Sequence, residues 1–176
     1  MANSGRPTSA AHATPAGGHA DLEGLLALEE GRLFAIAFSI LGDPAEAEDA
    51  VQETAAAAWR GWGRRREPER TRAWLTTICV HQALRRNRWR RRWGSALALG
   101  AERAQIDQHL EADGQHLDLH RAYRRLSRQQ RAVVSLHYMA GYTLAECTVF
   151  MGCSLGTVSS HLSRALSKLR EELKDE

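Results

Sequence analysis

The chain has 176 residues, a formal net charge of +3 and 43% hydrophobic residues. This length fits one medium domain or two small ones. None of the three cysteines forms a Cys-x-x-Cys pair, which argues against a disulfide framework and favours a reducing cytoplasm. No apolar run approaches the length that spans a bilayer, and the N-terminus has no signal-peptide core, so we expect no membrane insertion.

The small net charge hides a strong segregation of charge along the chain. Residues 23–59 carry eight acidic side chains against Arg32 alone, a net charge of −7. Residues 60–92 carry twelve arginines against Glu67 and Glu69, a net charge of +10. This asymmetry predicts two different partners, a polyanion at the basic block and another partner at the acidic one.

In the N-terminal part, the composition of residues 1–20, small and polar with almost no large apolar side chain, predicts a disordered tail. Apolar residues at helical spacing predict an amphipathic helix over residues 22–41, ended by Gly42. Asp43 and Pro44 are typical of a helix start, and that helix runs to Trp59. After a Gly- and Arg-rich loop, a long helix is expected over residues 71–93.

Residues 94–115 lack an apolar stripe and predict a flexible linker. Beyond it we expect helices over residues 117–126 and 128–140, the second capped by Ser127, and then a helix-turn-helix. Its first helix begins with a capping box at Thr143 and ends at Gly152, and Ser154 caps the second. No strand pattern appears. The prediction is an all-α fold of two small helical domains joined by a flexible linker, with a helix-turn-helix four-helix domain at the C-terminus.

The last helix has an apolar stripe and an opposite face of small, polar and basic side chains. Such a face suits a helix that lies in the major groove of DNA. On the residues alone, an ordinary helical hairpin is about as good an interpretation. The candidate DNA-contacting residues on this face are Thr157, Ser159, Ser160, His161, Ser163 and Arg164.

Two groups of motifs resemble the second and fourth conserved regions of bacterial RNA polymerase sigma factors. The first is Leu41-Gly-Asp-Pro-Ala-Glu-Ala-Glu-Asp-Ala-Val-Gln-Glu53 with Trp74-Leu-x-x-Ile78 and an Arg-rich helix end. The second is Leu126-Ser-x-x-Gln-Arg-Ala-Val-Val134 with Gly152-Cys-Ser-x-Gly-Thr-Val158 and Leu162-Ser-Arg-Ala-Leu166. Two such regions joined by a short linker resemble the extracytoplasmic-function (ECF) group. The resemblance divides the chain into a tail (1–20), region 2 (21–93), a linker (94–115) and region 4 (116–176).

The resemblance implies a role for each surface. Asp49, Gln52 and Glu53 would bind the clamp helices of the largest subunit of core RNA polymerase. The last helix would bind promoter DNA at the −35 element. The −10 element would be melted and bound as a single strand, with Trp74 in the core rather than a stacking platform; the candidate contacts are Arg72, Thr77, His81, Gln82, Arg85, Arg86 and Arg88.

The chain departs from the family pattern at four positions. His81 and Arg85 stand where the family usually has Asn and Asp, which puts the −10 preference in doubt. Ser159 and His161 stand where Lys or Arg is frequent, so Arg164 would be the main cation for −35 DNA.

The resemblance further implies a protein that acts in the cytoplasm, associates with the nucleoid within holoenzyme, is monomeric when free and is open to control by an anti-sigma factor. One alternative is a dimeric helix-turn-helix regulator of the response-regulator or quorum-sensing type. A second alternative, an enzyme, lacks a catalytic constellation, and no cofactor is expected. His116 and His120 have the spacing of half a metal site, but no third ligand is evident. Cys147 and Cys153 are interpreted as buried thiols rather than a redox switch.

Overall fold

The structure, a computed structural model, describes residues 17–64, 70–93 and 114–173. Within these residues every regular element is helical and no strand is present, which confirms the predicted all-α class. Most of the predicted tail and linker fall on residues 1–16 and 94–113, outside the described residues. The elements, in chain order, are α1 (Gly17–Leu41), α2 (Pro44–Gly61), η1 (Trp62–Arg64), α3 (Thr71–Trp93), α5 (Gly114–Arg124), α6 (Arg128–Val134), η3 (Ser135–Met139), α7 (Leu144–Met151) and α8 (Leu155–Glu172).

Short-range hydrogen bonds begin the helices where the sequence predicts. The Asp43 carboxylate accepts a hydrogen bond from the Glu46 backbone N–H at 2.7 Å, and Pro44 opens α2. Complete capping boxes at Ser127 and Thr143 begin α6 and α7. Because these contacts satisfy N–H groups that a helix leaves without internal partners, they define where each helix begins.

The helix predicted over residues 128–140 is instead divided into α6 and a π-helical turn, η3. The Ala140 N–H donates to the Ser135 carbonyl at 2.9 Å, a wider spacing than in an α-helix. His137 Nδ1 lies 2.7 Å from the Tyr142 carbonyl oxygen and ties the turn to the next segment. Two smaller differences are that α1 begins at Gly17 and that α5 ends at Arg124.

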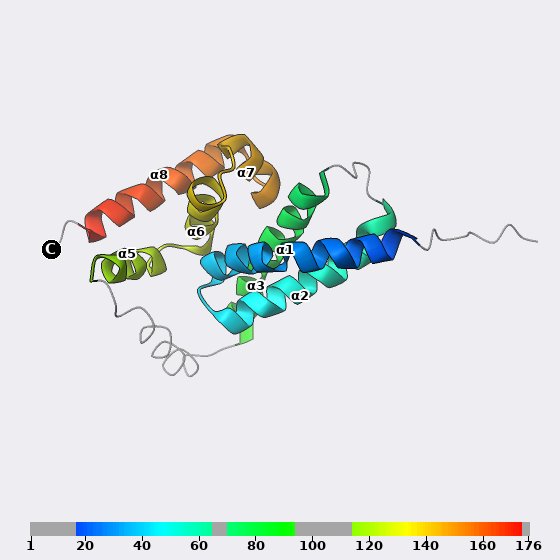
Figure 1. Ribbon diagram of the computed structural model, residues 1–176. Helices are drawn as coiled ribbons and strands as arrows, with labels where there is room; N and C mark the ends of the chain where they lie inside the picture. The colour runs from blue at the N-terminus through cyan, green and yellow to red at the C-terminus, as the bar shows by residue number, and fades with distance from the viewer. Residues whose placement is uncertain (1–16, 65–69, 94–113, 174–176) are drawn as a thin grey trace, which may run out of the picture.

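Helices α1 to α3 form an N-terminal half, and α5 to α8 with η3 form a C-terminal half. The halves pack against each other, α3 on α7 and α1 on α6 and η3 (Figure 1). Buried side chains of both halves belong to one hydrophobic cluster, with Ile40 and Val80 from the first half and Leu136 and Phe150 from the second. The two halves are the two small helical domains that the sequence predicts, and their cores are in contact.

The N-terminal half contains a buried carboxylate. Glu29 is only 5% exposed, and its two oxygens bind Arg32 Nε at 2.5 Å and Arg72 Nε at 2.7 Å. Burial by itself raises the pKa of Glu29, but the hydrogen bonds from Arg32 and Arg72 outweigh it and hold that pKa below 4.5. Arg32 Nη1 also donates to the Thr76 hydroxyl at 3.0 Å and to the Tyr142 hydroxyl at 3.3 Å. The ion pair of Glu29 and Arg32 on α1 therefore contacts both α3 and the C-terminal half.

We expect Glu29→Gln to lower the free energy of unfolding by about 1–3 kcal/mol at pH 7, because an amide cannot neutralise two guanidinium groups. The folded-state pKa of Glu29 is depressed, so its carboxylate stabilises the fold above pH 4.5 and loses this effect as the pH falls through the folded-state pKa. Urea unfolding at pH 7 and pH 3.5 measures the difference between the two proteins.

The control is Glu23→Gln, an exposed glutamate on the same helix, which should change the unfolding free energy by less than about 0.5 kcal/mol. A Glu29→Gln effect that is equal at both pH values would show that the charge of Glu29 is not the source of the stabilisation.

Candidate nucleic-acid and protein interfaces

Helix α8 presents the polar face that the sequence predicts. Val158, Leu162 and Ala165 are buried beneath it. Ser159, Ser163 and Arg164 are exposed on the outer side, whereas Ser160 and His161 are half-buried. The exposed part of this face is therefore narrower than the sequence indicated, and Arg164 is its exposed cation.

The first turn of α8 uses two hydroxyl groups for its own cap. The Ser154 hydroxyl accepts a hydrogen bond from the Thr157 N–H at 3.3 Å and lies 2.9 Å from the Thr157 hydroxyl. Thr157 thus has a structural role beside its candidate role in DNA contact. Its neighbour Leu155 is 53% exposed at the first helical position, an apolar side chain on the outer surface that the sequence analysis did not include.

Polar contacts near the far end of α8 join it to Arg125, the residue after α5. Lys168 Nζ donates to the Arg125 carbonyl at 2.6 Å, and Arg125 Nη1 lies 2.5 Å from a Glu172 carboxylate oxygen. Lys168 is therefore engaged in holding the helix. Arg164, in contrast to Lys168, lies on the exposed outer face of α8, where a polyanion can approach it.

Helix α3 carries the candidate contacts to the −10 element, and their side chains differ in solvent exposure and in hydrogen bonding. Arg72 and Arg85 are exposed, and Arg72 is held by Glu29. Thr77 is half-buried, and its hydroxyl donates to the Ala73 carbonyl at 3.0 Å. Thr77, His81 and Arg85 follow one another at four-residue spacing and share one helix face.

The remaining candidate contacts on α3 are Gln82, Arg86 and Arg88. Gln82 is half-buried. Arg86 and Arg88 lie within α3, but their side chains are outside the part of the chain that the structure describes. Trp74 is half-buried, as the core interpretation predicts, and its ring lies 6.4 Å from that of Trp62, centroid to centroid.

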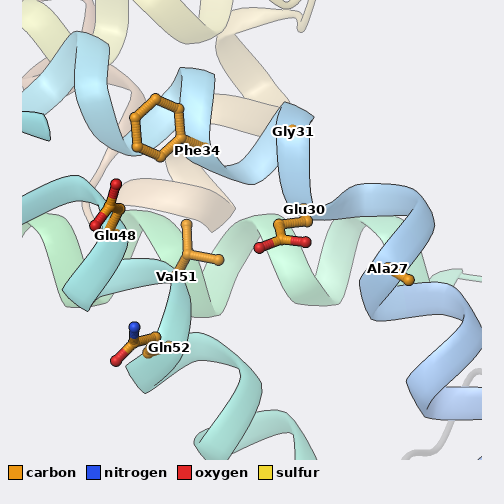
Figure 2. A pocket seen from close by; sticks show the side chains of 7 residues that line it. All are labelled: Ala27, Glu30, Gly31, Phe34, Glu48, Val51 and Gln52. Atoms are coloured by element: carbon orange, nitrogen blue, oxygen red, sulfur yellow. The ribbon is translucent and has the colours of Figure 1, made fainter.

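A groove of about 480 Å³ runs between α1 and α2. Phe34 and Val51 give it an apolar surface, and Glu30 and Glu48 place carboxylates beside Val51 (Figure 2). Phe34 also stacks on Phe38, with ring planes 3° apart, so its ring is held in place. An apolar groove bordered by carboxylates fits an amphipathic basic segment. Its lining is Ala27, Glu30, Gly31, Phe34, Glu48, Val51 and Gln52.

The groove extends the acidic face that the sequence predicts on α2. Asp49, Gln52 and Glu53 are all exposed on that helix, and Gln52 lines the groove directly. Sequence reasoning missed the contribution of α1, including Glu30 and Phe34. The sequence feature that could have indicated this contribution is Phe34, a large aromatic residue outside the apolar stripe expected to face the core.

Two of the three cysteines, Cys79 and Cys147, are buried in the core. Burial raises the pKa of both the Cys79 and the Cys147 thiol to about 11, so both are protonated at neutral pH. Cys153 is half-buried, and burial raises its pKa as well. Such thiols react slowly with oxidants, which agrees with the interpretation of Cys147 as a packing residue.

Among the residues with described positions, no group of three or more His, Cys, Asp or Glu side chains is arranged to hold a metal ion. Within the same residues, every helix is too short or too polar to cross a membrane. The side chain of His116 is outside the described part of the chain.

The chain matches two family descriptions in order, Sigma-70 region 2 over residues 25–94 and Sigma-70, region 4 over residues 116–169. It is similar to the ECF RNA polymerase sigma factor SigL of Mycobacterium tuberculosis, with 32% identity over 149 residues that cover 81% of this chain and 83% of the relative. The RNA polymerase sigma-E factor of Streptomyces coelicolor is 30% identical over 137 residues, which cover 76% of this chain and 75% of the relative.

Solved structures share the fold. The sigma factor RpoE, in a co-crystal with the anti-sigma factor NepR from Bartonella quintana, superposes with a TM-score of 0.64 and 26% identity, covering 88% of this chain and 97% of that one. CnrH, in complex with the cytosolic domain of CnrY, has the same fold, with a TM-score of 0.61, 24% identity and coverage of 91% of this chain and 92% of that one.

The imidazole of His161 lies close enough to Arg164 for the two charges to interact. Burial lowers the pKa of His161 from 6.5, and the Arg164 guanidinium lowers it further. We therefore expect Arg164→Ala to raise the pKa of His161, because one of these two causes is removed. An NMR titration of the histidine ring protons measures the shift. Arg170→Ala, an exposed arginine farther along α8, should leave the pKa unchanged; an equal shift in both variants would assign the effect to net charge.

Proposed function

This chain belongs to the ECF group of sigma factors, and from that membership we propose how its surfaces divide the work of directing RNA polymerase to promoters. Sigma factors of this family bind core polymerase and recognise promoter DNA. We assign residues 21–93 to core binding and the −10 element, residues 94–115 to a linker, and residues 116–176 to the −35 element. The dimeric-regulator alternative is not favoured.

We assign core binding to the groove between α1 and α2 together with Asp49, Gln52 and Glu53. The observation that carries this assignment is the combination of exposed carboxylates and an apolar groove on one surface. Carboxylates brought near DNA phosphates are repelled, so this surface favours a basic protein partner. The apolar lining adds contact area for the hydrophobic side of helices such as the polymerase clamp helices.

DNA recognition is assigned to α3 and α8. The arginines of α3 supply cations for the phosphates of a melted −10 strand. The outer face of α8 has short side chains around Arg164, which allow close approach to the major groove of the −35 duplex. Mixing the purified protein with core polymerase tests the whole assignment, because holoenzyme formation and promoter opening are both required.

We propose two further properties of this chain. An anti-sigma factor is proposed as a partner because the sigma factor RpoE is found bound to NepR. We propose that the free protein is a monomer in the cytoplasm and joins the nucleoid as part of holoenzyme.

Reversing two charges tests the core-binding surface. Asp49→Lys/Glu53→Lys should weaken binding to core polymerase by roughly 100-fold, because like charges then face the basic partner. Fluorescence anisotropy of labelled protein with core polymerase measures the affinity. The control is Asp21→Lys/Glu171→Lys, two exposed positions outside the groove with the same change of net charge. Equal affinities of both variants would place the contact on another helix face.

Replacing Arg164 tests −35 recognition. Arg164→Ala should cost about 1–3 kcal/mol of promoter affinity and relax the sequence preference at −35. Core binding should be unchanged, since Arg164 is remote from the groove in the sequence and on a different helix. Holoenzyme binding to promoters with substituted −35 elements is the measurement. Arg164→Lys distinguishes two modes, because lysine restores a phosphate contact but not a bidentate contact with a base.

A further inference from the structure

The first turn of α8 carries an apolar side chain at the position where a recognition helix meets the bases. Leu155 is the first residue of α8, directly after the Ser154 cap, and it is 53% exposed. In helix-turn-helix proteins, residues near the N-terminus of the second helix contact base edges in the major groove. Because the Cα–Cβ bonds of a helix tilt towards its N-terminus, a first-turn side chain points towards the leading end of the helix. Leu155 therefore lies at the leading end of the face assigned to the −35 duplex.

The exposed residues that continue from Leu155 along α8 are small and neutral. Ser159 and Ser163 follow at four-residue spacing, so the three side chains form one row, and both serines are exposed. Short side chains in this row suit close approach to the floor of the major groove, which is wide enough to admit a helix. The row has no positive charge with which to bind a phosphate, and its leading side chain has no polar atom with which to bind a base edge.

The residue after Leu155 has no side chain, although the fold has room for one. Outside its chain neighbours and the helix backbone, the nearest atom that a Cβ added at Gly156 would meet is Ser154 Oγ, at 4.0 Å. Gly156 is also not among the glycines with a positive φ. Neither packing nor backbone conformation therefore requires glycine at this position, and the missing side chain leaves the flank of Leu155 open.

One group in the major groove is chemically matched to an aliphatic side chain. Every base pair presents hydrogen-bond donors and acceptors there, but only thymine adds a C5-methyl group. A phosphate or a base nitrogen or oxygen atom covered by a leucine loses water without gaining a hydrogen bond. A methyl group covered by a leucine carries no such penalty, because the contact removes apolar surface of both partners from water.

We propose that Leu155 is a specificity-determining residue that contacts the C5-methyl group of one thymine in the −35 duplex. The proposal rests on the proposed assignment of α8 to the −35 element and adds a contact and a base to it. Thr157 is the other first-turn residue with a methyl group, but it stands about 200° around the helix from Leu155. Its hydroxyl lies 2.9 Å from the Ser154 hydroxyl, which holds its side chain at the cap.

Single exposed leucines are common on protein surfaces, so the test has to isolate the methyl contact. Replacing thymine by uracil removes the C5-methyl group and leaves the hydrogen-bonding groups of the base unchanged. The −35 sequence that wild-type holoenzyme prefers is first selected from promoters with a randomised −35 element. Each thymine on either strand of the selected element is then replaced in turn by uracil, and holoenzyme affinity is measured by competition with a labelled promoter.

We expect one of these replacements to weaken binding of wild-type holoenzyme about fourfold, which corresponds to about one methyl-sized apolar group. Holoenzyme with Leu155→Ala should bind the thymine and uracil promoters equally, because the side chain that contacts the methyl group is absent. Leu155→Met retains an apolar side chain of similar size and should retain the preference for thymine.

Two further variants are matched controls for this ratio of affinities. Leu173→Ala removes a similarly exposed leucine, 45% exposed, just beyond the opposite end of α8. Thr157→Ser removes the other first-turn methyl group but keeps the hydroxyl that takes part in the cap. Both variants should show the wild-type ratio between thymine and uracil promoters.

The outcomes separate this proposal from the function on which it rests. Equal ratios in wild type and Leu155→Ala would overturn the proposal, as would loss of the ratio in Thr157→Ser or Leu173→Ala. A selected −35 element without thymine on either strand would also overturn it. If wild-type holoenzyme selects no −35 sequence at all, the assignment of α8 to the −35 element fails instead, before any thymine is replaced.

Discussion

The need to neutralise the buried carboxylate of Glu29 determines much of the packing. A carboxylate with 5% exposure requires nearby cations, and Arg32 and Arg72 provide them. Arg32 has further donors that need acceptors in turn, and these are the hydroxyls of Thr76 and Tyr142. Tyr142 belongs to the segment before α7, so the satisfaction of one charge extends from α1 to the C-terminal half. Loss of any member leaves another buried polar group without a partner.

This network lies beside the candidate surfaces without covering their charged residues. Arg32 contacts Tyr142, just before α7, and the turn at Gly152 lies beside His81, whose side chain remains exposed. The groove on α1 and α2 lies on other faces of those helices, so its lining residues remain open to a partner. The outer face of α8 is also free of this packing. The packing of the two halves thus leaves both the proposed polymerase contact and the exposed candidate DNA contacts of α3 accessible.

Local hydrogen bonds also limit which side chains are available to DNA. In α8, Ser154 and Thr157 satisfy the start of the helix, and Lys168 fastens its end to Arg125. In α3, the Thr77 hydroxyl is committed to the Ala73 carbonyl. The exposed side chains of Arg164 and Arg85 form no such hydrogen bond within the described part of the chain. The side chains available to DNA are therefore fewer than the polar residues on these two helices.

The sequence by itself determined the helical class and most helix ends. The helix ends at Asp43, Ser127, Thr143 and Gly152 depend on contacts within a few residues, so the sequence predicts them without tertiary information. Helical periodicity likewise assigned Val158, Leu162 and Ala165 to the buried side of α8. The acidic residues on α2 were predicted as an exposed face, and they are exposed.

Only the tertiary structure decided the contacts between distant residues. Glu29 and Arg72 are 43 positions apart, and Arg32 and Tyr142 are 110 apart. A buried glutamate has the same sequence signature as an exposed one, because periodicity reports a helix face but not what packs on it. The π-helical turn, the groove on α1 and the joined core depend in the same way on neighbours from other helices. Local sequence does not specify those neighbours, so the packing of the two halves is seen only in the folded chain.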